Sequence, residues 1–268
     1  MRIGFMGDIV GKPGRLMIGK HLTRLQQEHF IDFTIANYEN ASHGFGLTEK
    51  NCKELLSYGI DMMSGGNHSF DKKEILTIFD TYPLIRPANY PSDTPGEGLF
   101  QTTLLGKNLA VINLMGHYTM PMVDNPFTKI IEMIEKLEAE GICHIVIDMH
   151  AEASSEKQAL FHLLKTRVSA ILGTHTHVGT DDFQIVNGTA YMSDIGLIGC
   201  RDNVIGMDKE VPIKQFLTGL KGHFDIPRKC KKILQIAVMQ ISEGKCSEAY
   251  KLKIFDDNRV IKTEAWLD

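Results

Sequence analysis

The chain has 268 residues, of which 43% are hydrophobic and 23% charged, as in a globular protein with a substantial core. Its net charge of -4 at pH 7 provides no global basic field, so we expect no stable nucleic-acid complex. No signal-peptide pattern opens the sequence and no apolar stretch approaches membrane-spanning length, which predicts a cytoplasmic protein without membrane contact.

Apolar segments that read as strands alternate with helical patterns over the first two thirds of the chain, as in layered α/β folds. The strands are predicted at 2–6, 33–36, 61–63, 101–105, 108–114, 144–147 and 168–172. The helices are predicted to begin at Pro13-Gly14, at Leu47-Thr48, after an N-cap at Asp71, and at Pro126. The first helix has the apolar positions Leu16, Ile18, Leu22 and Leu25, and the last has Ile130, Ile131, Ile134 and Leu137.

Beyond residue 180 the pattern turns towards strands. They are predicted at 183–186, 190–193, 233–241 and 249–254. Gly106-Lys107 and Asn187-Gly188 read as hairpin turns. No repeat and no second domain boundary is evident, so we expect one domain over 1–268.

The five cysteines are widely spaced, and no two of them have CxxC spacing. They are Cys52, Cys143, Cys200, Cys230 and Cys246. This pattern indicates neither a disulfide framework nor a thiolate zinc site. It suits a reducing compartment.

Five of the predicted strands lead into residues that can bind metal ions. These residues are Asp8, Glu39, Asn40, Asn67, His68, Asp148, His150, His175 and His177. A single polar residue at a strand end is most often a helix cap or a turn former. Five ends that converge on carboxylate, amide and imidazole groups instead indicate one site for Mn, Fe or Zn.

The most informative of these ends is Gly173-Thr174-His175-Thr176-His177. In an extended segment the side chains at i and i+2 point the same way, so both imidazoles would face one side. Two neutral imidazoles at the carboxyl edge of a sheet are good ligands for a divalent transition metal. The alternative is a pair of surface histidines in a polar turn.

In this order, the blocks resemble those of the calcineurin-like metallophosphoesterases, and more specifically the YmdB-like bacterial phosphodiesterases, over nearly the whole chain. The blocks are Gly7-Asp8-Ile9-Val10-Gly11, Asn37-Tyr38-Glu39-Asn40, Gly65-Gly66-Asn67-His68, Asp148-Met149-His150-Ala151-Glu152-Ala153 and the segment 173–177. The stretches 86–91, 154–157 and 205–208 add to the likeness. The resemblance implies a four-layer α/β/β/α sandwich with a dinuclear metal site across the strand ends.

The first two blocks depart from the general superfamily pattern. The first block there usually reads Asp-x-His, whereas Val10 stands at the His position here, and the bridging Asp of the second block is replaced by Glu39. By resemblance to the YmdB-like branch, Glu39 bridges the metals and Asn40 supplies the oxygen missing at position 10. One metal is then held by Asp8, Glu39, Asn40 and His177, and the other by Glu39, Asn67, His150 and His175. These donors suit Fe or Mn, and Zn is the alternative ion for the site.

The implied reaction is attack of a metal-bridging hydroxide on phosphorus, in line with the leaving oxygen. His68, next to Asn67, is the candidate that donates a proton to that oxygen. The alternative role for His68 is a helix-start residue that hydrogen-bonds Asp71. Further residues that could line the pocket or contact phosphate are His43, His117, Arg86 and Arg201.

The resemblance implies a hydrolase that acts on small phosphodiesters, with 2',3'-cyclic nucleotides as the best match. A strained cyclic diester needs no long nucleic-acid groove, in agreement with the absence of a basic stripe. Two alternatives stay open: a broad-specificity phosphomonoesterase, and a nucleotide-binding regulatory protein with little turnover. The expected partner is the small substrate, and the oligomeric state, including a homo-oligomer, is left open.

Overall fold

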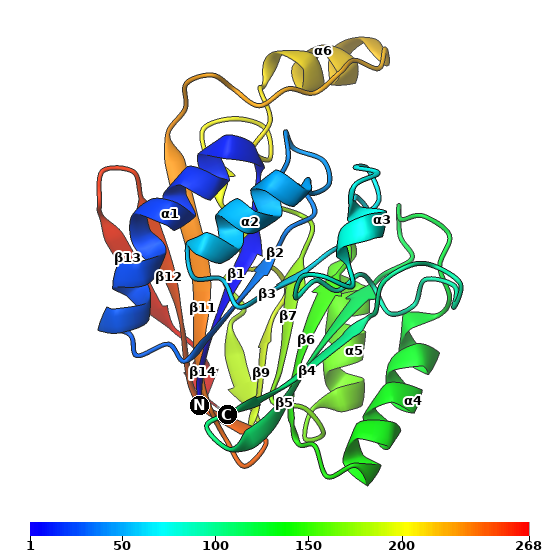
Figure 1. Cartoon of the computed structure of the whole chain (residues 1–268). Helices are drawn as coiled ribbons and strands as arrows, with labels where there is room; N and C mark the ends of the chain where they lie inside the picture. The colour runs from blue at the N-terminus through cyan, green and yellow to red at the C-terminus, as the bar shows by residue number, and fades with distance from the viewer. Residues whose placement is uncertain (268) are drawn as a thin grey trace.

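Residues 1–267, which the computed structural model describes, form two β-sheets packed face to face (Figure 1). The first has the strand order β13–β12–β11–β1–β2–β3, with β10 paired to β11. Its strands are β1 (Arg2–Asp8), β2 (Phe33–Asn37), β3 (Met62–Ser64), β10 (Gly199–Cys200), β11 (Lys232–Ser242), β12 (Lys245–Phe255) and β13 (Val260–Glu264). The second has the order β14–β8–β9–β7–β6–β5–β4. Its strands are β4 (Leu99–Leu104), β5 (Lys107–Met115), β6 (His144–His150), β7 (Ala170–Thr174), β8 (Gln184–Val186), β9 (Thr189–Met192) and β14 (Trp266–Leu267).

Helices cover both outer faces of this pair of sheets. They are α1 (Gly11–Glu28), α2 (Glu49–Ser57), α3 (Ile75–Ile78), α4 (Pro126–Ala139), α5 (Ser154–Leu164) and α6 (Glu210–Thr218). α1 and α2 pack on the first sheet, and α4 and α5 pack on the second (Figure 1). The expected four-layer α/β/β/α sandwich is confirmed. Within residues 1–267, none of the helices is long and apolar enough to cross a membrane.

Three large apolar clusters hold the layers together. Leu22 of α1 packs on the first sheet, Ile134 of α4 packs on the second, and Phe5 and Leu172 lie in the cluster between the sheets. All four side chains are fully buried, and each contributes about 1.5–3 kcal/mol through burial. Because both faces of each sheet are covered, the central strands are continuous apolar runs, which is why they were recognisable in the sequence.

The topology brings the carboxyl ends of the central strands to one edge. β1, β2 and β3 are parallel, and so are β5, β6 and β7. The two sets meet at this edge, where the side-chain amide of Asn37 in β2 donates a 3.0 Å hydrogen bond to Asp148 in β6. The polar residues that follow the strands therefore come from both sheets.

Of the four predicted helix starts, two are confirmed, the one at Pro13 lies two residues after the true start of α1 at Gly11, and one is wrong. Thr48 caps α2 and accepts a hydrogen bond from the backbone N–H of Asn51, and Asn125 caps α4 directly before Pro126. The third helix is wrong, because α3 begins only at Ile75 and makes a single turn, while Asp71 accepts from His68 instead of capping. In the first helix, the prediction that Leu16 lies on the apolar face is wrong, since this side chain is 47% exposed. The other predicted apolar positions of that helix are buried.

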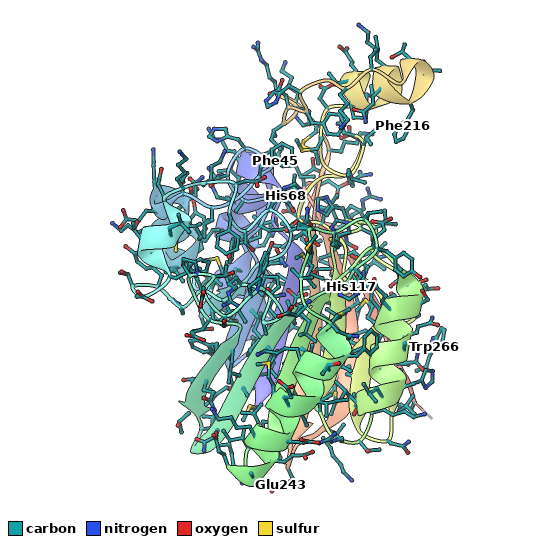
Figure 2. The ribbon with its side chains drawn as sticks, turned by 90° about the vertical axis from the view of Figure 1, so that its right-hand side faces the viewer. Phe45, His68, His117, Phe216, Glu243 and Trp266 are labelled. Atoms are coloured by element: carbon teal, nitrogen blue, oxygen red, sulfur yellow. A yellow bond between two sulfur atoms is a disulfide. The ribbon has the colours of Figure 1, made fainter. Side chains whose placement is uncertain are left out.

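The hairpin at Asn187-Gly188 is confirmed, with positive φ at both residues. The other hairpin turn lies one residue earlier than predicted, at Leu105-Gly106, since Leu104 pairs with Lys107. Five elements have no predicted counterpart in the sequence: α5, α6, β10, β13 and β14. α6 has no buried apolar stripe that a sequence pattern could reveal, because Pro212 is the one buried residue of this helix. Phe216 is exposed and lies on the arm that extends from the body of the protein (Figure 2).

The expectation of unpaired cysteines is wrong for two of the five. Cys200 and Cys230 form a disulfide, whereas Cys52, Cys143 and Cys246 are free. A separation of 30 residues leaves no spacing signal in the sequence. The fold creates the proximity, because β10 pairs with the beginning of β11 and closes the base of the arm that carries α6.

We expect the Cys200→Ser/Cys230→Ser variant to lose about 3–4 kcal/mol of unfolding free energy, because the closed loop no longer restricts the unfolded chain. Denaturant unfolding without reductant measures this loss. Adding reductant should lower the unfolding free energy of the wild type by the same amount. Cys143→Ser is the matched control and should unfold like the wild type. Equal stability of the double variant and the wild type would contradict a contribution from this bond.

Candidate metal centre

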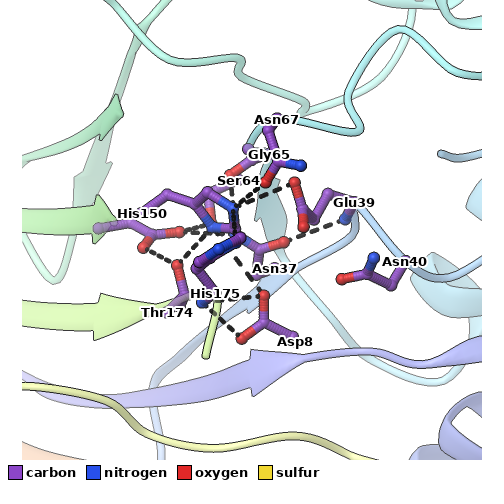
Figure 3. Close-up of polar contacts among 12 residues, drawn as sticks. Asp8, Asn37, Glu39, Asn40, Ser64, Gly65, Asn67, His150, Thr174 and His175 are labelled. Carbon is purple, nitrogen blue, oxygen red and sulfur yellow. Dashed lines mark hydrogen bonds and ion pairs between the residues drawn. The ribbon is translucent and has the colours of Figure 1, made fainter. Parts of the chain in front are cut away.

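All eight residues predicted for the site come together at the carboxyl edge of the two sheets. Asp8 ends β1, Glu39 and Asn40 follow β2, Asn67 and His68 follow β3, His150 ends β6, and His175 and His177 follow β7. Figure 3 shows side chains from both sheets pointing into this common space. The carboxylates of Asp8 and Glu39 and the ring of His150 are almost completely buried.

The donor atoms form two groups that share one carboxylate. Ligand atoms of Glu39, His150 and His175 lie within 4.8 Å of one another, and so do those of Asp8, Glu39 and His177. Each group also includes an amide oxygen. Asn67 Oδ1 lies 2.9 Å from His150 Nε2, and Asn40 Oδ1 lies 3.1 Å from His177 Nε2. This grouping agrees with the two ligand sets that the family resemblance implies.

The two histidines of the 173–177 segment reach the site from a loop, so the prediction of an extended segment is wrong. β7 ends at Thr174, and the backbone turns left-handed at His175 (φ 95°) and His177 (φ 64°). Non-glycine residues in this region cost of the order of 1–3 kcal/mol each. The turn is useful because it sends one imidazole to each donor group.

A buried ion pair holds this loop in place. Lys157 Nζ on α5 donates to the carbonyl of Thr174 (2.8 Å) and to Asp194 Oδ2 (3.1 Å). Asp194 also accepts from the backbone N–H of Thr176 (3.0 Å). Both charged side chains are about 1% exposed, so the ion pair is removed from water. Through the Thr174 carbonyl and the Thr176 N–H it fixes the backbone of the loop.

The outer nitrogen of each imidazole has a neighbour that leaves the inner nitrogen for the centre. His177 Nδ1 lies 2.7 Å from the carbonyl oxygen of Ile205, which can only accept, so Nδ1 donates and Nε2 faces inward. His150 Nδ1 lies 2.9 Å from Thr174 Oγ1, and His175 Nε2 lies 3.0 Å from a carboxylate oxygen of Glu152. Imidazoles that bind metals are held in this way.

Burial and charge compete in setting the pKa values. Burial raises the pKa of Asp8 to about 6, although nearby imidazoles oppose it. Burial also acts to raise the pKa of Glu39, but His150 and the N–H of His68 lower it to about 2. For His150, burial acts to lower the pKa, and the carboxylates of Glu39 and Asp8 raise it to about 9. Binding of a metal ion to Nε2 at neutral pH would therefore require loss of a proton from His150.

These donors fit a pair of transition-metal ions. The set is made of carboxylate, amide and imidazole groups without a thiolate, which suits Mn, Fe or Zn. Gly66 allows the close approach, because a Cβ at this position would overlap Glu39 Oε2 and His150 Nε2. The residue must be glycine for the two ligand atoms to stay where they are.

His68 lies beside the two groups without joining either. Its backbone N–H donates to Glu39 Oε2 (2.9 Å), and its Nδ1 lies 2.8 Å from Asp71 Oδ2. The side chain is 30% exposed, and the ring of Phe45 meets it edge-on with centroids 5.0 Å apart (Figure 2). Because Nδ1–H donates its hydrogen bond to Asp71, Nε2 is the ring nitrogen that faces a substrate.

The other candidates have structural partners elsewhere. Arg86 is buried and donates to the carbonyls of Pro87 and Thr94, and Arg201 lies over the ring of Phe255. His43 and His117 are exposed. Lys157 and Asp194 support the loop although neither is predicted from the sequence to do so. Their spacing of 37 residues along the chain gives no pattern, and only the fold brings them together.

Comparisons with known proteins agree with this fold and identify its family. A family model described as "YmdB-like protein" matches residues 5–252. The chain is 45% identical over 262 residues to a 2',3'-cyclic-nucleotide 2'-phosphodiesterase of Bacillus subtilis (strain 168), covering 96% of this chain and 98% of that protein. A hypothetical protein of Thermus thermophilus has a solved structure with a TM-score of 0.88 and 34% identity, covering 99% of this chain and 100% of that one. A novel phosphatase of Mycoplasma pneumoniae has a TM-score of 0.88 and 29% identity, covering 95% and 93%. The chain belongs to the YmdB-like family.

Proposed function

We propose that this protein is a dinuclear-metal-dependent phosphodiesterase that hydrolyses small phosphodiesters, with 2',3'-cyclic nucleotides as its substrates. The observation that carries the proposal is the buried carboxylate of Glu39, which lies within reach of both donor groups. The name of the Bacillus subtilis relative, with 45% identity over nearly both whole chains, supports the substrate class.

The proposed ligands of the first ion are Asp8, Glu39, Asn40 and His177. Those of the second are Glu39, Asn67, His150 and His175. We propose Fe or Mn as the native ions, with Zn as the alternative. When bound, such a pair supplies positive charge to the phosphoryl oxygens and activates water for attack.

The remaining steps belong to side chains of this chain. The loop that begins after β3 places His68 next to Asn67, at the exposed side of the buried donor groups. Asp71 orients the His68 ring through Nδ1, so that Nε2 can give a proton to the leaving oxygen. For a 2',3'-cyclic diester the leaving oxygen is a ribose hydroxyl, which leaves poorly without a proton.

The test is metal content by elemental analysis, paired with hydrolysis of a 2',3'-cyclic nucleotide, bis-p-nitrophenyl phosphate and p-nitrophenyl phosphate. We expect about two ions per chain and faster turnover of the diesters than of the monoester. Preference for the monoester would identify a phosphomonoesterase, and tight nucleotide binding without turnover would identify a regulatory protein. A chain that stays inactive after Mn and Fe are supplied would contradict the proposal.

We also propose a small-molecule substrate as the main partner and a cytoplasmic location, where reductants would act on the Cys200–Cys230 disulfide. The net charge of -4 supports a small substrate rather than a nucleic-acid polymer.

A further inference from the structure

We propose that Thr174, oriented by Asp148, is the positioning residue that makes His150 present Nε2 to the metal centre. The inference rests on the metal centre proposed above, but not on the identity of its substrate. A chain of hydrogen bonds lies below the site, and the groups that it joins fix the direction of each bond.

Asp148 accepts hydrogen bonds from three neighbouring strands. Ser64 Oγ of β3 and Asn37 Nδ2 of β2 both donate to Oδ2, at 2.5 Å and 3.0 Å, and Thr174 Oγ1 of β7 donates to Oδ1 at 2.7 Å. All four side chains are fully buried, so water does not compete for these bonds. The carboxylate therefore joins both sheets directly beneath the donor groups.

The direction of the next bond follows from the first. A hydroxyl has one proton, and the Thr174 hydroxyl donates it in a hydrogen bond to Asp148 Oδ1. An ionised carboxylate can only accept. Thr174 Oγ1 must then accept from His150 Nδ1, which lies 2.9 Å away. With the proton on Nδ1, the lone pair of the neutral ring is on Nε2, the nitrogen next to Glu39 Oε2 (3.2 Å). Thr174 thus selects the tautomer that can bind metal.

The same network reaches the shared carboxylate. Asn37 Oδ1 accepts from the backbone N–H of Glu39 at 3.0 Å, while the amide of the same side chain donates to Asp148. Asp148 therefore fixes a ligand from each sheet: His150 through Thr174, and Glu39 through Asn37. His177 depends on a different acceptor, the carbonyl of Ile205, and serves as an internal reference.

The decisive variants are Thr174→Val, which keeps the shape but removes the hydroxyl, and Thr174→Ser, which restores it. Mn²⁺ titration of the chelator-stripped protein should show two binding steps in the wild type. In Thr174→Val the step that involves His150 should weaken by about 10- to 100-fold, and in Thr174→Ser it should recover. Thr176→Val is the matched control, because within residues 1–267 the Thr176 hydroxyl hydrogen-bonds only with the backbone of Val178.

Asp148→Asn tests the direction of the bonds. Ser64 and Asn37 both donate to Oδ2, so the amide oxygen stays on that side and the new NH₂ group faces Thr174. The hydroxyl then accepts from Asn and turns its proton towards His150 Nδ1, which leaves the proton of the neutral ring on Nε2. We expect this variant to lose as much Mn²⁺ affinity as Thr174→Val, although Thr174 itself is unchanged.

NMR of the Zn²⁺-loaded protein separates this role from a purely structural one. A Thr174 that only stabilised the fold would leave the His150 Nδ1–H resonance unchanged when its hydroxyl is removed. The wild type should show a protected His150 Nδ1–H resonance, which moves upfield in Thr174→Val and is retained in Thr174→Ser, while the His177 Nδ1–H resonance stays fixed. This wild-type signal is decisive even where a variant fails to fold, since its absence overturns the proposal. Unchanged Mn²⁺ affinity in Thr174→Val also overturns it. A wild type that binds no metal would instead refute the metal centre.

Discussion

Replacing Glu39 by Gln is expected to leave fewer than two metal ions per chain and less than about 1% of wild-type turnover. The Glu39 carboxylate lies in both donor groups and is about 1% exposed. Its pKa of about 2 keeps it ionised, since His150 and the His68 N–H overcome the effect of burial. Gln has a similar size but offers one oxygen and no charge. The loss should exceed the roughly 10- to 100-fold that follows from removing an outer partner of a ligand.

Elemental analysis after gel filtration, together with turnover of bis-p-nitrophenyl phosphate, measures both effects. Glu132→Gln is the matched control, because it makes the same chemical change on the exposed side of α4 and should keep both ions. The melting temperature of each chelator-stripped protein shows whether folding is preserved. Two ions per chain and normal turnover in Glu39→Gln would refute the shared-carboxylate assignment.

The layers of the fold could be predicted because their signals are local. Strands such as 144–147 and 168–172 are apolar runs, as expected for strands covered on both faces, and Pro126 marks the start of α4. α6 could not be predicted in this way. Its apolar residues, such as Phe216, do not face the body of the protein, so no periodic stripe identifies it as a helix.

The candidate site was predictable for a related reason. Its residues lie at strand ends, so the parallel strands of each sheet and the packing of the two sheets gather Asp8, Glu39 and His150 at one edge. The supports are different in kind. Lys157 reaches the site from the first turn of α5, and Asp194 comes after β9. They support the loop through a hydrogen bond to its backbone. This loop turns left-handed at His175, and no residue pattern predicts that turn.

His68→Ala is expected to keep both metal ions and to lose about 10²- to 10⁴-fold in turnover, as is usual for the loss of a general acid. His68 belongs to neither donor group, and only its backbone N–H touches Glu39. The size of the loss should depend on the leaving group. p-Nitrophenolate leaves readily without a proton, so bis-p-nitrophenyl phosphate should lose less than a 2',3'-cyclic nucleotide, whose leaving oxygen is a ribose hydroxyl.

The alternative role of His68, as a residue that only stabilises its turn through Asp71, predicts a different result. The hydrogen bond between the two side chains, 2.8 Å long, would then be the whole contribution. In that case His68→Asn, which retains a donor for Asp71 but cannot transfer a proton, would restore turnover. Under the catalytic role it would stay as inactive as His68→Ala. His223→Ala, at a highly exposed histidine, controls for the loss of an imidazole. Metal loss in His68→Ala, or equal losses with both substrates, would refute the proton-donor role.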